Sequence, residues 1–167
     1  MSKQIDKQKV KARELTDYYY FTTMMPDDWS VTPSTYRFSR YDAIASNGER
    51  VIYTELKGRD IPLTDEIKEE GAYIECSKAD YLYKFKDAAI VQFFWKSNVT
   101  YVWNIKDRDK WKKIYKLMDN NNEDKEDVYK WVYLLPFDDK NARYTVNLTN
   151  YHELFVHNYN QLTGKQI

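Results

Sequence analysis

The hydrophobic and polar residues of positions 50–57 alternate with a period of two, which is typical of a strand with one buried face. Residues 36–45 have a similar strand-like pattern. Asn47-Gly48 lies between the two segments and is the strongest short hairpin signal. We therefore expect residues 36–45 and 50–57 to pair as a hairpin with a two-residue loop. Gly58 and Pro62 are expected to end its second strand.

Residues 88–95 form a continuous apolar run, rich in β-branched and aromatic side chains, which favours a buried central strand. Residues 99–105 alternate again and are expected to pair with this strand. Between the hairpin and the apolar run, Thr64 and Asp65 are plausible N-caps of a helix that reaches about Phe85, with an irregularity at Gly71. A strand, a helix and a buried strand predict a right-handed parallel crossover.

Both ends of the chain have weaker patterns. Residues 2–16 contain helix formers with sparse apolar contacts, which indicates a short helix docked on the surface. Residues 18–21, Tyr-Tyr-Tyr-Phe, favour a strand, and the prolines and aspartates that follow favour a loop.

Past residue 105 the spacing of apolar residues changes again. Residues 109–118 have helical spacing, and residues 120–122, three asparagines, predict an exposed loop. Residues 129–137 and 142–148 resemble the two strands of a second hairpin, and residues 151–159 a closing helical turn. We expect one domain over residues 1–167, with a core at about 5–105 and a C-terminal elaboration at 106–167.

Composition agrees with a folded globular protein, because hydrophobic residues make up 43% and charged residues 31% of the 167. Cys76 is the only cysteine, which excludes an intramolecular disulfide and a cysteine-cluster zinc site. No apolar run approaches the roughly 18 residues of a spanning helix, and the first residues lack an apolar signal segment. These features predict an intracellular, cytoplasmic protein without a membrane partner, in the host cytoplasm if a phage encodes it.

The formal net charge is zero, so bulk electrostatics give no support to nucleic-acid binding. Lysines and arginines nevertheless cluster in two segments, residues 3–13 and 106–116. Local basic patches are compatible with this clustering, although solvated helix faces explain most such runs.

Opposite charges gather on one face of the predicted hairpin. Glu55 and Lys57 are two residues apart and leave the same face of the strand. If Asn47 and Gly48 are the loop, facing positions sum to 95, and Asp42 lies opposite Tyr53 and diagonal to Glu55. Diagonal neighbours are about 7–8 Å apart, so both carboxylates can reach one shared ion.

This arrangement suits the hydrolysis of a phosphodiester. Two carboxylates, with the Leu56 carbonyl as a further hard oxygen, can hold Mg²⁺ or Mn²⁺, which stabilises the developing charge and lowers the pKa of water. Lys57 would position or help to deprotonate the attacking water. A cross-strand ion pair on a wet sheet face is the simpler explanation of Glu55 and Lys57 alone.

With Asp42 as a first acid and Glu55-Leu56-Lys57 as an E-x-K element, the sequence resembles the PD-(D/E)XK nuclease superfamily over about residues 5–105. Tyr41 stands where the family's motif has proline, a position that varies. The resemblance implies a restriction-endonuclease-like α/β fold, in which helices flank a central mixed sheet in α-β-β-β-α-β order. It also implies a metal-dependent DNA nuclease, such as a Holliday-junction resolvase or a phage or mobile-element repair or recombination enzyme, with a homodimer as a family habit.

The resemblance suggests two further site residues. Lys78 lies in the apolar stripe of the predicted helix, so it either points toward the sheet, where a family member would contact phosphate, or extends its ammonium to solvent. Glu14 resembles the acid that some members bring to the metal from the first helix, although a surface glutamate is the commoner identity.

Aromatic residues are abundant, and most are expected to be core. The candidates for stacking on substrate bases are Tyr18, Tyr19, Tyr20 and Trp29. Structural roles are favoured for His152 and His157, and Glu75 is expected to be solvated. The alternative to a nuclease is a catalytically silent module of the same fold that binds nucleic acid or protein.

Overall fold

The computed structural model describes residues 6–34, 40–118 and 127–164. The strands are β1 (Ser30–Pro33), β2 (Ala43–Ser46), β3 (Val51–Arg59), β4 (Ala72–Glu75), β5 (Ala88–Phe94), β6 (Val99–Asn104), β7 (Lys112–Met118), β8 (Val128–Leu135) and β9 (Ala142–Arg143). The α-helices are α1 (Lys7–Met24), α2 (Asp65–Glu70), α3 (Cys76–Leu82) and α4 (Tyr151–Thr163). Short 3₁₀ turns are η1 (Trp95–Ser97), η2 (Ile105–Lys110) and η3 (Asp139–Asn141).

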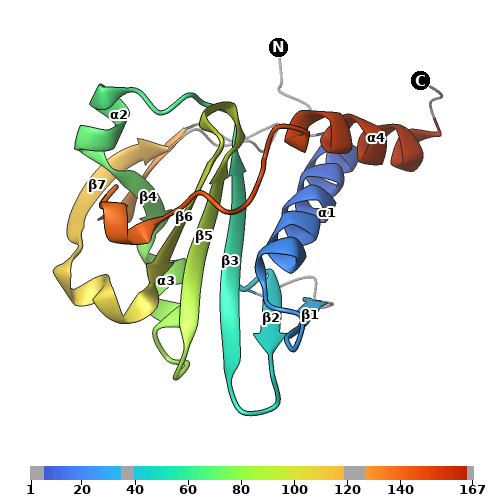
Figure 1. Ribbon diagram of the computed structural model, residues 1–167. Helices are drawn as coiled ribbons and strands as arrows, with labels where there is room; N and C mark the ends of the chain where they lie inside the picture. The colour runs from blue at the N-terminus through green and yellow to red at the C-terminus, as the bar shows by residue number, and fades with distance from the viewer. Residues whose placement is uncertain (1–5, 35–39, 119–126, 165–167) are drawn as a thin grey trace.

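A six-stranded mixed sheet forms the centre, in the order β1-β2-β3-β5-β6-β9. β3 and β5 are parallel, and the other neighbours are antiparallel. Helices α1 and α4 lie together on one side of this sheet, and the three-stranded sheet β4-β8-β7 lies on the other with α3 (Figure 1). The predicted α/β class, with a mixed central sheet flanked by helices, is confirmed.

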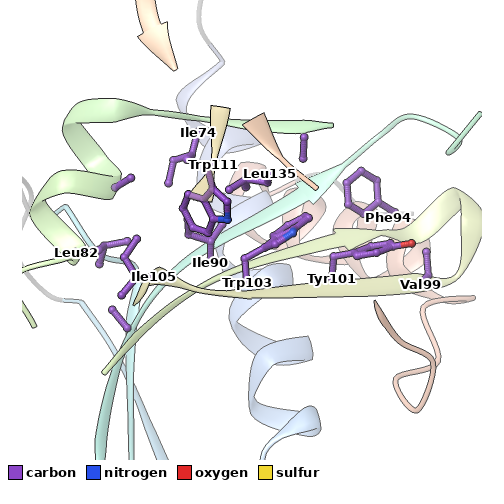
Figure 2. Close-up of a cluster of buried hydrophobic side chains, with 13 residues drawn as sticks. Ile74, Leu82, Ile90, Phe94, Val99, Tyr101, Trp103, Ile105, Trp111 and Leu135 are labelled. Atoms are coloured by element: carbon purple, nitrogen blue, oxygen red, sulfur yellow. The ribbon is translucent and has the colours of Figure 1, made fainter. Parts of the chain in front are cut away.

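Two hydrophobic clusters fill the two sides of the central sheet. One contains Ile90, Trp103 and Leu135 and lies between the two sheets (Figure 2). The other contains Tyr20 and Tyr151, from α1 and α4. β5 contributes to both clusters, because Ile90 faces one and Val91 the other. Burial on both faces explains the continuous apolar run, so the prediction of a central strand there is confirmed, as is its antiparallel partner β6.

Helix α1 is longer than the sequence pattern indicated. Asp6 caps it by accepting from the Gln8 and Lys9 amides, and the helix continues through the Tyr-Tyr-Tyr-Phe run to Met24. The prediction of a strand at residues 18–21 is wrong. Helical spacing buries Tyr20 and Phe21 against the sheet and overrides the strand preference of aromatic residues.

The segment expected to be one helix from Thr64 to Phe85 is three elements. Thr64 caps α2 as predicted, because its Oγ1 accepts from the Ile67 amide at 3.3 Å. Gly71, with φ +100°, ends this helix, and β4 then pairs with β8 before α3 begins. A Cβ at Gly71 would lie 2.9 Å from the Leu135 carbonyl oxygen, so glycine permits the close approach of β8.

The C-terminal elaboration was predicted least well. Residues 112–118 form strand β7 instead of a helix and pair with β8. β8 is a strand as expected, but its partners are β4 and β7. β9 is two residues long and pairs with β6, so the second hairpin at 129–137 and 142–148 is wrong. The predicted helical turn near residue 151 is confirmed as α4, and the asparagine loop at 120–122 lies outside the described residues.

The first hairpin has a different loop from the one expected. Ser46 pairs with Val51, which leaves a four-residue loop in which the Asn47 side chain accepts from the Glu49 and Arg50 amides. Facing positions therefore sum to 97, not 95. Strand β2 begins at Ala43, and residues 36–39 of the expected strand lie outside the described part. β3 continues through Gly58 to Arg59, beyond the predicted end.

Candidate functional site

The structure brings the two predicted acids together at the start of β2. The Asp42 amide donates to the Thr54 carbonyl at 2.7 Å, although Thr54 already pairs with Ala43, so the regular ladder ends at Ala43. Asp42 therefore lies just beyond the ladder, beside residues 55 and 56 of β3. The two carboxyl groups lie on the same side of the sheet, close enough for Asp42 to act on Glu55 by charge and by a side-chain hydrogen bond.

Asp42 is also fixed to the strand that carries Glu55. Its Oδ2 accepts from the Leu56 amide at 2.7 Å, while the Leu56 side chain is buried on the opposite face. One carboxylate oxygen of Asp42 therefore has a structural partner. This bond holds the acid beside β3 and fixes its distance to Glu55.

Glu55 is the most perturbed group of the predicted set. Its side chain is 13% exposed, and burial together with the nearby charge of Asp42 raises its pKa to about 7. Lys78 opposes this change, because its Nζ lies 3.2 Å from Glu55 Oε1. Lys78 therefore does point toward the sheet, from the first turn of α3. Its partner is a carboxylate of the site.

Lys57 follows Glu55 on the same face of β3. Part of its side chain is open to solvent, but the surrounding protein and the positive charges of Arg59 and Lys78 lower the pKa of its ammonium. A lowered pKa brings a lysine closer to the neutral amine that can accept a proton.

Glu14 faces this site from α1. Partial burial and the charge of Asp42 raise its pKa, which shows that the two carboxyl groups are near each other. The charge of Asp42 therefore acts on two other acids, Glu14 of α1 and Glu55 of β3. Within residues 6–34, 40–118 and 127–164, however, no three aspartate, glutamate, histidine or cysteine side chains are grouped tightly enough to hold a metal ion.

A cavity of about 370 Å³ lies on the Lys57 side of Glu55. Its lining includes Glu55, Lys57, Arg59 and Lys78, together with residues of β4, β5 and the end of β7. Asp42 and Glu14 are not part of this lining. The cavity is therefore lined by three cations, Lys57, Arg59 and Lys78, and two acids, Glu55 and Glu75. Its volume is within the range of small-ligand sites, about 300–1,000 Å³.

Arg59 is a site residue that sequence reasoning missed. Its Nε donates to the Gln92 side chain at 3.2 Å and its Nη2 to the Tyr73 carbonyl at 3.3 Å. The alternation that joins Glu55 to Lys57 continues to residue 59 and would have identified it. Arg59 was not included because the strand was expected to end at Gly58, whereas β3 continues to Arg59.

The support beneath the site was also missed. Asp17 of α1 is 4% exposed, and its carboxylate accepts from the Gly58 amide at 3.0 Å and from the Tyr151 hydroxyl. Burial nevertheless raises the pKa of Asp17 to about 7. A Cβ at Gly58 would overlap the Tyr151 hydroxyl and lie 2.7 Å from Asp17 Oδ1. Glycine at position 58 thus lets α1 and α4 meet under β3.

The aromatic candidates do not line the site cavity. Tyr18 donates to the Val31 carbonyl at 2.8 Å, Tyr20 is buried in stacking contact with Tyr151, and Trp29 lies beside Arg50. Tyr19 is half exposed and borders a different and larger cavity, about 850 Å³, between α1 and α4. That cavity contains none of the residues predicted to be catalytic, so the chemistry argues for the smaller one.

The remaining candidates have structural contacts. His152 stacks on Trp95 at 5.4 Å, in keeping with a structural role, and His157 borders the larger cavity. Glu75 is only partly solvated, because it accepts from Lys130 at 3.2 Å.

Comparison of the chain with family models, curated proteins and solved structures found no match. None of the helices described is long and apolar enough to cross a membrane.

Proposed function

We propose that the chain is a Mg²⁺- or Mn²⁺-dependent nuclease that hydrolyses DNA phosphodiester bonds and has a restriction-endonuclease-like core. The observation that carries the proposal is the convergence of Asp42, Glu55, Lys57 and Lys78, which come from three separate elements. The order of α1, the antiparallel strands β1, β2 and β3, then α2, β4, α3 and the parallel strand β5 is compatible with an α-β-β-β-α-β core in which β4 is an insertion that pairs with β8.

The donor set fits a hard divalent cation. Mg²⁺ is bound in proteins by one or two carboxylates and keeps several waters, so a dedicated group of three protein ligands is not required. Asp42 and Glu55 would hold the ion, with the Leu56 carbonyl, and Glu14 stands next to Asp42. The repulsion between two adjacent carboxylates, which raises the pKa of Glu55, is relieved by a bound cation. Such an ion would neutralise phosphate charge and acidify water.

The side chains that line the cavity would handle the proton of the attacking water and the charge of the phosphate. Lys57, with its lowered pKa, would accept or hold the proton of the attacking water. Lys78 and Arg59 would contribute positive charge to the phosphate oxygens as the transition state forms. Glu55 accepts a hydrogen bond from Lys78 and so holds its ammonium in the cavity.

Cleavage assays test the proposal. Supercoiled, linear, single-stranded and four-way-junction DNA would be incubated with Mg²⁺ or Mn²⁺ and, in parallel, with chelator. Asp42→Asn and Lys57→Ala should each reduce metal-dependent cleavage by about 100-fold or more. Asp87→Asn and Lys106→Ala are matched controls, because Asp87 pairs with Arg50 and Lys106 donates to the Tyr83 and Phe85 carbonyls, and none of these residues lines the site cavity or the cavity beside it. Full activity in both site variants would reject the assignment.

The Glu55–Lys78 ion pair favours a second candidate, a catalytically silent module that binds nucleic acid or protein. The ammonium at 3.2 Å offsets part of the cost of burying the carboxylate, so Glu55 has a partner that is not a metal. Calorimetric titration with Mn²⁺ separates the candidates. A nuclease should take up the ion in a manner that Asp42→Asn abolishes, whereas a silent ion pair should show no uptake at this site.

A further inference from the structure

A second cavity of about 320 Å³ lies directly beside the site cavity. The two share Arg59, Tyr73 and Gln92 in their linings, so these residues form a common wall. Gln92 is buried in the centre of β5 and holds the Arg59 guanidinium in place. A ligand that spans both spaces would pass along Arg59.

The lining of the second cavity differs in chemistry from that of the site cavity. Its apolar members come from the loop before α2, from α2, from β4, from β5 and from the segment after β8: Ile61, Ile67, Ala72, Phe94 and Phe137. Its two acids are neutralised, because Asp60 pairs with Lys96 at 3.0 Å and Glu70 with Lys116 at 3.1 Å. The space therefore suits a flat, mostly apolar group with a few polar atoms.

The wall between the cavities carries one positive charge, that of Arg59, which lies 5.1 Å from the centre of the Tyr73 ring. Lys57 and Lys78 add two more in the lining of the site cavity. Cations beside an apolar space complement a nucleotide, which joins a phosphate anion to an aromatic base.

We propose that this second cavity, the base cavity, binds the base of an unpaired nucleotide next to the phosphate that is cleaved. The inference rests on the proposed function and extends it to a substrate class. A base within a duplex is stacked on both faces and paired along one edge, so only a nucleotide in a single strand, a flap or an opened end places its base there. The Gln92 amide and the Arg59 guanidinium are the polar groups that would meet the base and its phosphate.

Binding measurements with abasic oligonucleotides test the base cavity. Fluorescein-labelled single-stranded 12-mers, intact or with one abasic position moved along the strand, would be titrated in chelator and followed by anisotropy. For the parent protein, loss of the base at one position should weaken binding about 5- to 100-fold, which is the contribution expected of one docked base. An intact 12-base-pair duplex should bind more weakly than the single strand.

Ile61→Trp fills the mouth of the base cavity, and Val51→Trp is its matched control. The two side chains are 41% and 43% exposed, but Val51 begins β3 at the opposite end of the strand. Ile61→Trp should bind intact and abasic strands equally, whereas Val51→Trp should retain the difference seen with the parent. Circular dichroism confirms that both variants are folded.

Three results would overturn the inference: no measurable binding by the parent, equal affinity of the parent for all abasic strands, or an unchanged base effect in Ile61→Trp. Preference for duplex over single strand would count against it equally. Because binding is measured in chelator, cleavage of the intact strand by the parent and its loss in Asp42→Asn test the proposed function separately. Metal-dependent cleavage without a base effect would leave the nuclease and remove the base cavity.

Discussion

The buried carboxyl group of Asp17 should make the stability of the protein depend on pH. Burial raises its pKa from 3.8 to about 7, even though Tyr151, Gly58 and the Arg13 charge favour the ionised form. The native state therefore holds this proton more tightly than the unfolded chain does. The stabilisation is complete below about pH 3.8 and is lost as pH rises through 7. A pKa difference of about three corresponds to about 4 kcal/mol of unfolding free energy, as an upper estimate.

Asp17→Asn should remove this contribution, because asparagine resembles the protonated acid and retains an acceptor for the Gly58 amide. Urea unfolding between pH 5 and 8.5 measures the effect. The variant should already be more stable than the parent by about 1.5 kcal/mol at pH 5, and the difference should grow to about 4 kcal/mol above pH 7. Glu55 also has a raised pKa, but it contributes equally to both proteins and cancels in the difference. Asp87→Asn, a surface control, should leave the parent's slope unchanged. Identical slopes for Asp17→Asn and the parent would refute the reasoning.

Three further substitutions or titrations test other parts of the structure. Gly58→Ala should destabilise the protein by about 1–3 kcal/mol in urea unfolding, because its Cβ overlaps the Tyr151 hydroxyl; a neutral effect would show that α4 does not pack there. Thr64→Ala should cost about 1 kcal/mol through loss of the α2 cap, and an unchanged thermal midpoint would contradict this. If Mn²⁺ binds at Glu55, the affinity of the protein for Mn²⁺ should rise between pH 6 and 8 and level off above pH 8. Calorimetry in buffers of different ionisation enthalpy should detect the release of the Glu55 proton. A pH-independent affinity would exclude Glu55 as a ligand.

Elements that depend on local chemistry could be predicted from the sequence. The central strand β5 is buried on both faces, and its continuous apolar run reflects that burial directly. Thr64 caps its helix through atoms three residues away, so its effect is visible in a short window. Helix α4 has the spacing of Tyr151 and Phe155 on one buried face.

Elements that depend on distant partners could not be predicted in the same way. Strand β4 is four residues long and exists because β8, about sixty positions later, pairs with it. Residues 112–118 have a helical spacing of apolar residues, and the pairing with β8 overrides it. In α1, the packing of Tyr20 under Tyr151 overrides a local strand preference.

The candidate site was found because its key signal is local, although one assumption about it was wrong. Alternation along β3 places Glu55 and Lys57 on one face for any register. The position of Asp42 depends on the loop length, which the Asn47 side chain sets by accepting two amides. A loop two residues longer changes the pairing sum from 95 to 97, and the regular ladder ends at Ala43, so the place of Asp42 beside Glu55 does not follow from the pairing alone. The face of β3 that carries Glu55 and Lys57 was therefore predictable, and the distance between Asp42 and Glu55 was not.

Strand β3 separates the structural and chemical roles of its residues by position. Thr54, Leu56 and Gly58 are bound to neighbouring elements, through the Ala43 carbonyl, Asp42 and Asp17. The residues that alternate with them, Glu55, Lys57 and Arg59, face the cavity. Asp42 belongs to both sets, because it binds the Leu56 amide and also raises the pKa of Glu55.

This double role determines which substitution is informative at position 42. Alanine would remove the acceptor of the Leu56 amide together with the charge, so lost cleavage could result from a displaced strand. Asparagine keeps an oxygen acceptor and removes only the charge. If the strand remains in place, the pKa of Glu55 should fall in Asp42→Asn, because a repelling carboxylate has gone. Titration of the Glu55 side-chain carbon signal by NMR measures this shift. An unchanged pKa would mean that the two acids do not interact, and the proposed metal site would lose its basis.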